Sequence, residues 1–395
     1  MPAASAVPVL VLGGGLTALG VIRTLGRARI PSYVVTDHSD FVRHSRWFRG
    51  APPSSVGAPA EGGLEGYLKG LPVERAVLMP CSDIWTAEAA RLEPPLALRF
   101  PSSLAAPCAL QAFLDKACLT RALVAAGIPH PCTMEVSRPA DLDMIPDEAF
   151  TCCFLKPRDS QRFFRRFGVK AFRVGGRDEA AEKLRTIAAS GLAAIFQEYI
   201  PGPASNHFFV DGFVSRQGRL VAAFARQRLR MYPLDFGNST YMVSVPQEQV
   251  AGAITAVGQL MEHVRYRGIF NAEFKHDERD GLYKMLEVNA RPWWYVEFAA
   301  RCGVDVCYMA YRDALGLPVE PATAYRVGRT LVYPHYDYGA CREQLRKGQL
   351  SFWTWARSWL TAEQPVFRWS DPLPALIETS EGLGRRLRHM MSTSS

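Results

Sequence analysis

The sequence lacks several features that would set it apart from ordinary folded, globular proteins. No uninterrupted apolar stretch approaches the roughly 20 residues that span a bilayer, and no block of like charges forms a basic or acidic tail. With 48% hydrophobic and 21% charged residues, the composition leaves no room for a long disordered tract. A chain of 395 residues can bury large cores and is expected to divide into two or three domains.

The nine cysteines are odd in number, and none forms the C-x-x-C spacing of zinc and redox sites. We therefore expect reduced thiols in the core. No basic segment precedes the apolar run Val7–Leu12, which leads into glycines as a buried strand does, so we expect no signal peptide and a cytoplasmic location. The net charge of +8 favours anionic ligands, and because the arginines are scattered we expect no nucleic acid partner.

The start of the chain predicts alternating strands and helices. Val7–Leu12 has the pattern of a buried strand, Gly13–Gly15 that of a tight turn, and Thr17–Arg27 that of an amphipathic helix. Further strands are expected at Ser32–Thr36 and Ala76–Met79. This alternation predicts a parallel sheet.

The glycine turn also fits a dinucleotide-binding fingerprint, Gly13-x-Gly15-x-x-Ala18, with Asp37 where a ribose-binding acid would lie. An NAD-dependent oxidoreductase would use such a loop, and it stays open as an alternative. It would leave unexplained the acidic residues found much later in the chain.

Prolines between residues 94 and 107 interrupt the pattern and predict a domain boundary near residue 108. A helix is expected at Leu110–Ala126. A strand is expected at Phe150–Pro157, with Lys156 near its end. The segment Arg158–Lys170 is predicted to be a loop rich in Arg and Gly. Such a loop can close over phosphates, and a solvated basic loop is the alternative.

The strand expected at Ala193–Ile200 leads into Pro201-Gly202, where a chain crossing between lobes can offer its backbone to an adenine edge. An ordinary strand end is the alternative. Later, Arg226, Arg228 and Arg230 alternate on a predicted strand. Arg228 is the candidate clamp for a substrate carboxylate, and a charged outer sheet face is the alternative.

A predicted hairpin near residue 280 carries the most information about function. Its strands contain Glu273 on one side and Glu287, Asn289 and Arg291 on the other, and Asp280-Gly281 is typical of a two-residue turn. Folding about this turn sets Glu273 roughly opposite Glu287. A one-residue slip would change the face that Glu273 joins, and we take the register that unites them.

Two carboxylates about 5 Å apart would repel by about 3 kcal/mol at an effective dielectric near 20. A shared divalent cation reverses the sign of this interaction. Because Glu273, Glu287 and Asn289 offer only oxygen ligands, they suit magnesium that also bridges to phosphates better than zinc. An exposed hairpin with ordinary charges is the alternative.

Taken in this order, the segments over residues 7–318 resemble the ATP-grasp superfamily of carboxylate-amine ligases. The motifs that carry the resemblance are Asp115-Lys116 with Gly127-Ile-Pro129, Leu155-Lys156-Pro157, Gln197-Glu198-Tyr199-Ile200-Pro-Gly, Glu273, and Glu287-x-Asn289-x-Arg291. The run from Arg226 to Gly237, together with Ser205-Asn-His207, resembles the branch that contains D-aspartate ligase.

The resemblance implies ATP and magnesium, or manganese in its place, as cofactors. The implied nucleotide-binding residues are Lys116, Lys156, Gln197, Glu198, Tyr199 and Ile200, and the implied metal ligands are Glu273, Glu287 and Asn289. Arg291 would steady the transferred phosphoryl group. Members of the family often place a ribose-binding acid after the hinge, and because Ser205-Asn206-His207 stands there, the ribose contacts are open.

The resemblance also implies an α/β fold, with α+β character in the ATP-binding lobes and a Rossmann-like amino-terminal domain. The expected domains are a pre-ATP-grasp domain at 1–108, a small lobe at 109–196, a large lobe with the metal site at 197–318, and a carboxy-terminal extension at 319–395. Asp83 is expected at a strand end that faces the same cleft.

The implied reaction joins a carboxylate, expected to belong to an amino acid, to an amine acceptor. ATP converts the carboxylate into an acyl phosphate, and the amine then displaces phosphate. Besides the oxidoreductase, a non-catalytic nucleotide-binding protein on the same fold stays open as an alternative.

The extension contains an aromatic segment, Phe352–Trp359, near Arg342, Arg346 and Lys347. An interfacial helix on a membrane has this composition. Packing against the core, or against a second subunit of a homodimer, explains it equally.

Overall fold

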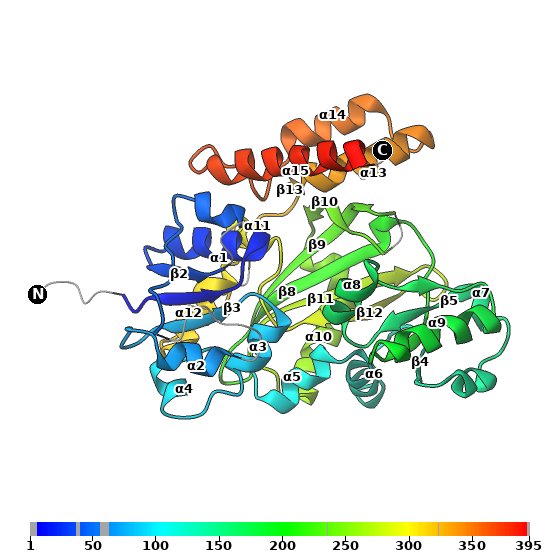
Figure 1. Ribbon diagram of the computed structural model, residues 1–395, viewed down its shortest axis with the longest axis horizontal. Helices are drawn as coiled ribbons and strands as arrows, with labels where there is room; N and C mark the ends of the chain where they lie inside the picture. Colours follow the sequence, from blue (N-terminus) through cyan, green and yellow to red (C-terminus); the bar gives the residue numbers. More distant parts are fainter. Residues whose placement is uncertain (1–5, 37–39, 56–62, 235, 323, 393–395) are drawn as a thin grey trace, which may run out of the picture.

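The computed structural model describes residues 6–36, 40–55, 63–234, 236–322 and 324–392. It contains three β-sheets, which lie at the left, centre and right of Figure 1, with the last helices of the chain above them. This mixture of helix and strand is the predicted α/β class. Asp37 lies outside the described residues.

The left-hand sheet is parallel, as predicted, with strand order β2-β1-β3. Its strands are β1 (Val9–Leu12), β2 (Ser32–Val35) and β3 (Val77–Pro80). Every residue of β1 is buried, which explains its unbroken apolar run. Helix α1 (Gly15–Arg27) follows and begins two residues earlier than expected. The other helices of this part are α2 (Leu64–Lys69), α3 (Asp83–Ala89) and α4 (Leu96–Arg99).

The helix expected at 110–126 is two helices, α5 (Pro107–Leu114) and α6 (Lys116–Ala125), so the prediction of one continuous helix is wrong. Asp115 between them has extended backbone angles and caps α6, accepting hydrogen bonds from the backbone N–H groups of Ala117 and Cys118. An N-cap residue has non-helical backbone angles, so α5 ends before Asp115 and a new helix begins at Lys116.

The right-hand sheet has the order β4-β7-β5-β6. Its strands are β4 (Thr133–Val136), β5 (Cys153–Pro157), β6 (Phe172–Arg173) and β7 (Ala194–Glu198). The strand predicted from residue 150 starts at Cys153, because the short helix α7 (Ala149–Cys152) precedes it. The segment predicted as a loop contains helix α8 (Ser160–Phe167), whose buried Phe163 packs into the same core as Phe196, and α9 (Arg177–Ala189) follows.

The central sheet is antiparallel, with the order β12-β11-β8-β9-β10-β13. Its strands are β8 (His207–Val214), β9 (Leu220–Tyr232), β10 (Asn238–Ser244), β11 (Gly268–Asp277), β12 (Leu282–Asn289) and β13 (Thr330–Val332). Helix α10 (Ala251–His263) joins α5 and α6 in the apolar core under one face. Helices α11 (Val296–Cys302) and α12 (Val306–Ala314) pack against α1.

The predicted two-residue turn between β11 and β12 is wrong. The last paired residues are Asp277 and Leu282, so the connection has four residues, 278–281, and Gly281 adopts a φ of +72°. Further along, Phe274 pairs with Met285 while Glu273 pairs with Glu287, which makes Leu286 an extra residue on β12. This β-bulge shifts the register by one residue.

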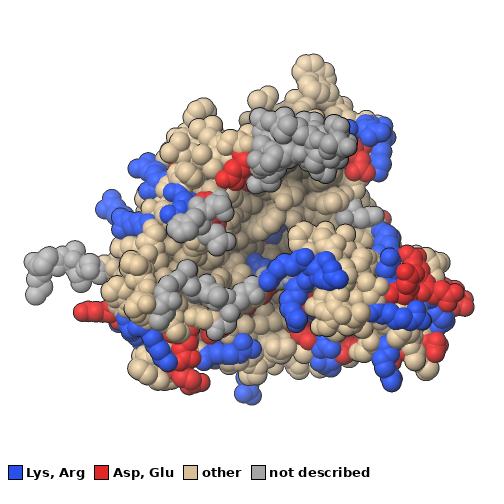
Figure 2. Space-filling view, viewed as in Figure 1, with Lys and Arg blue, Asp and Glu red and all other residues tan. Residues whose placement is uncertain are grey.

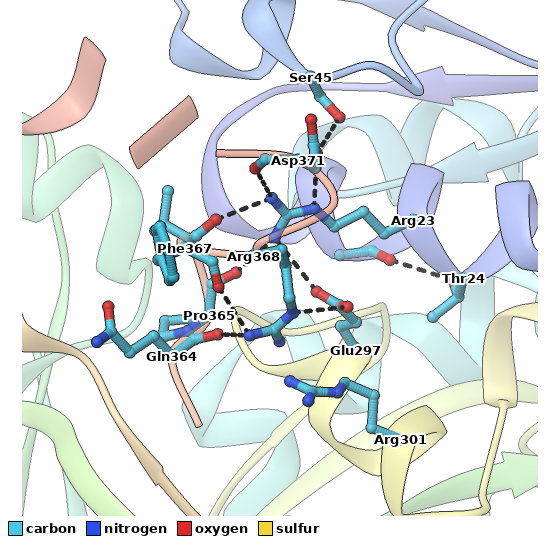
Figure 3. Close-up of polar contacts among 12 residues, drawn as sticks. Arg23, Thr24, Ser45, Glu297, Arg301, Gln364, Pro365, Phe367, Arg368 and Asp371 are labelled. Carbon is cyan, nitrogen blue, oxygen red and sulfur yellow. Dashed lines mark hydrogen bonds and ion pairs between the residues drawn. The ribbon is translucent and has the colours of Figure 1, made fainter. Parts of the chain in front are cut away.

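The last three helices are α13 (Pro334–Arg346), α14 (Phe352–Thr361) and α15 (Leu373–Ser392). The chain between α14 and α15 is fixed to the left-hand domain by Arg23 of α1, as Figure 3 shows. Its buried guanidinium donates to Asp371 Oδ2 at 3.0 Å, to the Pro365 carbonyl at 2.9 Å and to the Val366 carbonyl at 2.8 Å. Ser45 donates to the same Asp371 carboxylate at 2.6 Å. The carboxy-terminal segment is therefore integrated into the fold.

All nine cysteines are free thiols. Five are buried, in line with the expectation of core thiols, but Cys108, Cys132 and Cys152 are exposed, so for these three the expectation is wrong. None of the helices in the described ranges combines the length and the apolar character needed to cross a lipid bilayer.

Candidate active site

The residues of β11 alternate between two environments. Those in the apolar core are Phe270, Ala272 and Phe274, and those on the opposite face are Asn271, Glu273 and Lys275. The same alternation along β9 puts Arg226, Arg228 and Arg230 on this opposite face, and all three are buried. The central sheet therefore has one apolar face, while its opposite face is charged over these residues and apolar around Ile269, Phe213 and Phe224.

The bulge brings the two predicted carboxylates together. Glu273 lies directly across from Glu287, and Asn271 lies across from Asn289, so all four side chains belong to the charged face. Asn289 Nδ2 donates to Asn271 Oδ1 at 3.0 Å. The sequence analysis missed Asn271. Its position two residues before Glu273 is the signal that would have found it.

Glu273 is held by two donors on one of its oxygens. His207 Nδ1 and Arg228 Nη2 each lie 2.9 Å from Glu273 Oε1. Burial alone would raise the pKa of Glu273, but Arg228 and His207 outweigh it and hold that pKa far below its usual range. Burial, with help from Arg228, lowers the pKa of His207 to about 4, so the ring is neutral at pH 7 and donates its Nδ1–H to the carboxylate.

Lys116, the first residue of α6, approaches the other carboxylate. Its Nζ lies 3.4 Å from Glu287 Oε1 and donates to Ser160 Oγ at 2.7 Å. The preceding Asp115 fixes this end of α6, because Arg158 donates to its carboxylate from Nε at 3.0 Å and from Nη2 at 2.6 Å. A bidentate pair of this kind sets both position and orientation. Arg158 and Ser160 thereby connect the start of α8 to Lys116.

Lys156 reaches the same place from β5. Its Nζ donates to Gln197 Oε1 at 3.3 Å and to the Leu286 carbonyl at 3.5 Å, so it bridges the right-hand sheet and the bulge. Removal from solvent lowers the pKa of Lys156 to about 8, and the Glu287 carboxylate opposes this shift. Burial would raise the pKa of Glu287, but Lys116 and Lys156 lower it below its usual value.

The four hinge residues have different surroundings. Gln197 contacts Lys156 and Thr133, and Ile200 is buried. The Glu198 carboxylate accepts a hydrogen bond from the Cys132 backbone N–H at 3.1 Å. Cations lie over the Tyr199 ring: Arg173 at 4.6 Å and Lys275 at 4.7 Å from its centroid.

Arg291 joins the hairpin to the left-hand domain. Its Nε donates to Asp83 Oδ1 at 2.6 Å, and its Nη2 donates to Asn289 Oδ1 at 3.3 Å. Asp83 is the first residue of α3 and follows the last residue of β3, Pro80, by three positions. It therefore lies near the strand end, as predicted, and contacts Arg291 of the hairpin.

The three arginines of β9 each have a protein partner. Arg226 pairs with Asp211 at 2.7 Å, Arg230 pairs with Asp337 of α13 at 2.7 Å, and Arg228 donates to Ser239 as well as to Glu273. A substrate carboxylate at Arg228, the predicted clamp, would have to compete with Glu273.

The glycine turn at the start of α1 already holds an internal anion. Asp40 Oδ2 accepts from the Gly15 backbone N–H at 2.8 Å and from the Thr36 hydroxyl at 2.7 Å. This is the place where a dinucleotide would need to put its pyrophosphate. The oxidoreductase alternative therefore finds no support in this loop.

Side chains from the central and right-hand sheets and from α6 meet beside a hollow in the molecule. Figure 2 shows this hollow between the left-hand domain, the carboxy-terminal helices and α8, with blue basic side chains over α8 at its rim. The predicted residues that the structure brings together are Lys116, Lys156, Gln197, Arg228, Glu273, Glu287, Asn289 and Arg291. Glu198, Tyr199 and Ile200 lie just beyond, at the end of β7.

Among the described residues, no group of three or more His, Cys, Asp and Glu side chains is arranged to hold a metal ion. Glu273 and Glu287 form a pair with two amide side chains beside them. An ion held by this set needs oxygen ligands from a second source, such as the phosphates of a nucleotide.

Known proteins share this architecture. Residues 193–332 match a family model described as ATP-grasp in the biosynthetic pathway with Ter operon. The D-aspartate ligase of Enterococcus faecium is 30% identical over 148 residues, which cover 36% of this chain and 34% of that ligase. The match thus spans about a third of the length of this curated relative.

Two solved structures are similar over most of the chain. Carboxyaminoimidazole ribonucleotide synthase from Aspergillus clavatus, complexed with ATP, has a TM-score of 0.64 at 15% identity and covers 82% of this chain and 81% of its own. An L-amino acid ligase from Bacillus licheniformis has a TM-score of 0.59 at 16% identity and covers 83% and 79%. The chain therefore has the fold of these enzymes.

Proposed function

We propose that this ATP-grasp protein is an ADP-forming ligase that joins a carboxylate, expected to belong to an amino acid, to an amine. The family match and the fold are its starting points. The D-aspartate ligase and the L-amino acid ligase among the similar proteins favour an amino acid substrate.

One observation carries the proposal: two carboxylates paired across β11 and β12 face lysines from two other segments. Lys116 comes from α6 and Lys156 from β5, and both lower the pKa of Glu287. An exposed hairpin with ordinary charges would not need this arrangement. A transferred phosphoryl group, with its metal ion, requires both signs of charge in one place.

The oxygen ligands fit magnesium, or manganese in its place. We assign Glu273, Glu287 and Asn289 to it, with Asn271 fixing the Asn289 amide. Arg228 and His207 both bind Glu273 Oε1, so we assign Oε2 to the ion. The ion, when bound, would neutralise charge on the phosphates of ATP.

The remaining residues divide the handling of ATP. Lys116 and Lys156 would contact its phosphates, while residues 197–200 would border the adenine. Tyr199 N–H already donates to the Cys152 carbonyl at 2.7 Å, so the adenine must use other backbone groups of the hinge. The non-catalytic alternative is disfavoured because the carboxylates and Arg291 are all present.

The chemistry follows from these positions. An oxygen of the substrate carboxylate attacks the terminal phosphorus, ADP departs, and an acyl phosphate forms. Arg291, oriented by Asp83, stabilises the charge of the phosphoryl group with its planar guanidinium. The amine nitrogen then attacks the acyl carbon, the C–O bond to phosphate breaks, and the amine loses a proton as the amide forms.

Trapping the acyl phosphate tests the proposal. With ATP, magnesium and a panel of amino acids but no amine, hydroxylamine should give a hydroxamate together with ADP and phosphate. Chromatography of the nucleotides separates this outcome from an adenylate mechanism, because the latter releases AMP and pyrophosphate. AMP formation would overturn the assignment of Arg291 and the carboxylate pair.

Removing the Lys156 ammonium should weaken ATP binding. Lys156→Ala is expected to raise the Kd for ATP by about 10- to 100-fold, because a charge-assisted hydrogen bond contributes about 1.5–3 kcal/mol. Calorimetry measures the change, with Lys69→Ala as the control, because the Lys69 side chain on α2 is 63% exposed. An unchanged Kd for Lys156→Ala would place the phosphates elsewhere.

A further inference from the structure

The carboxy-terminal extension exposes an unusual number of large apolar side chains. Those of α14 are Phe352, Trp353 and Leu360, with exposed fractions of 54%, 79% and 86%. Nearby in the chain are Trp369, Leu373 and Leu376, at 91%, 55% and 60%. Isolated exposed apolar residues are ordinary, whereas several that share one face of an element mark a contact surface.

The opposite face of α14 is anchored to the protein. Trp359 Nε1 donates to Asp337 Oδ2 at 2.7 Å, and Ser358 Oγ accepts from Arg230 Nη2 at 2.8 Å. Trp355 packs edge-to-face against Trp359, with ring centroids 5.1 Å apart. The expectation that the aromatic segment packs on the core therefore holds for this inner face. Because it is fixed, the outer face is presented in one orientation.

The outer face carries two exposed apolar side chains in line. Trp353 and Leu360 are seven residues apart, which places them two turns apart on the same side of the helix. Arg357 lies between them and is also exposed. Figure 1 places α14 at the outer edge of the molecule, above α15 and away from the hollow. Another body can therefore approach this face without entering the active site.

The charges near α14 indicate the kind of partner that would bind its outer face. Helix α14 contains no acidic residue, and exposed Arg346 and Lys347 precede it at the end of α13, where Lys347 also pairs with Glu343 at 3.1 Å. Figure 2 shows tan side chains at the top of the molecule, and both blue and red side chains toward the right-hand end of this edge. Aromatic and aliphatic side chains bordered by Lys and Arg suit the boundary between acyl chains and anionic headgroups.

We propose that the outer face of α14, formed by Trp353, Arg357 and Leu360, docks on an anionic lipid surface. The aromatic and leucine side chains insert at the headgroup level, while Arg346, Lys347 and Arg357 contact lipid phosphates. The inference does not depend on the ligase reaction. It would hold the protein, with its candidate active site, at a membrane surface.

Vesicle co-sedimentation of the full chain tests the proposal. Phosphatidylcholine vesicles with about a third phosphatidylglycerol should bind the protein, pure phosphatidylcholine should bind it weakly, and raised salt should reduce the binding. The double variant Trp353→Ser and Leu360→Ser should lower the partition coefficient by about tenfold or more, since each substitution removes an apolar side chain that would be buried in the lipid. Replacing Arg346 and Lys347 by Gln should lower it by about fivefold per charge.

The matched control replaces Leu98 and Met144 by Ser, since these side chains are 72% and 88% exposed but lie far from α14 in sequence. This control should bind like the unaltered protein, and equal melting temperatures would establish that all variants fold. Absence of binding to anionic vesicles would overturn the proposal. A dimer in light scattering that the double variant converts to a monomer would also overturn it, because a second copy would then cover the face.

Discussion

Replacing Glu287 by glutamine is expected to lower ADP formation by about 100-fold or more at saturating ATP. The substitution keeps the volume of the side chain and removes one of the two anionic ligands proposed for magnesium. The side chain is 30% exposed and its ion pair with Lys116 is long, at 3.4 Å, so the fold should tolerate the change. Product formation and melting temperature should be measured on the same preparation.

The control for this experiment is Glu262→Gln, which alters an exposed carboxylate on α10 outside the site. It should leave both quantities unchanged. If Glu287→Gln retained full turnover at saturating magnesium, the metal assignment would be wrong. A large fall in melting temperature would instead indicate that the carboxylate pair is structural.

Replacing Asp337 by alanine is expected to lower the free energy of unfolding by about 3–5 kcal/mol, the cost of leaving a buried charge without its partner. Asp337 is fully buried and accepts from Arg230 Nε at 2.9 Å and from Arg230 Nη2 at 2.7 Å. It also accepts from Thr240 and Trp359, which join β10 and α14 to the same carboxylate. Denaturant unfolding of the full chain measures the loss.

Glu343 offers a matched control, because it belongs to the same helix and also forms an ion pair. Its partner Lys347 lies 3.1 Å away on the surface, where such pairs contribute about 0–1 kcal/mol. Glu343→Ala should therefore unfold almost like the unaltered protein. Equal losses for the two variants would contradict the view that burial makes the Asp337 pair important.

Much of the architecture could be predicted from the sequence, because local patterns set it. The apolar run at residues 9–12 has no other stable place than a buried parallel strand, and the alternating arginines of β9 follow the period of a strand. The family and fold inferred from the ordered motifs agree with the matched family model and the solved structures. The assigned roles of individual residues stay predictions.

What could not be predicted depends on contacts distant in the chain. The helix break at Asp115 is fixed by Arg158, which lies 43 residues later, and helix α8 places its Phe163 in the same apolar core as Phe196. The pairing of Arg230 with Asp337 joins positions 107 residues apart. No local sequence pattern shows which basic side chain will form an ion pair with which acidic side chain.

The extra residue Leu286 changes which side chains of β12 face the apolar core: odd-numbered residues such as Met285 face it before the bulge, and even-numbered residues such as Val288 face it afterwards. Before it, Met285 packs into the apolar core, and after it Val288 does so, although an unbroken strand would send residues three apart to opposite sides. The part of β12 that carries Glu287 and Asn289 therefore has its own register with β11, separate from that of the part next to the 278–281 turn. Changes in the length of the 278–281 connection can therefore accumulate without rotating the carboxylates, whereas loss of one residue at the bulge would exchange the core and the active site.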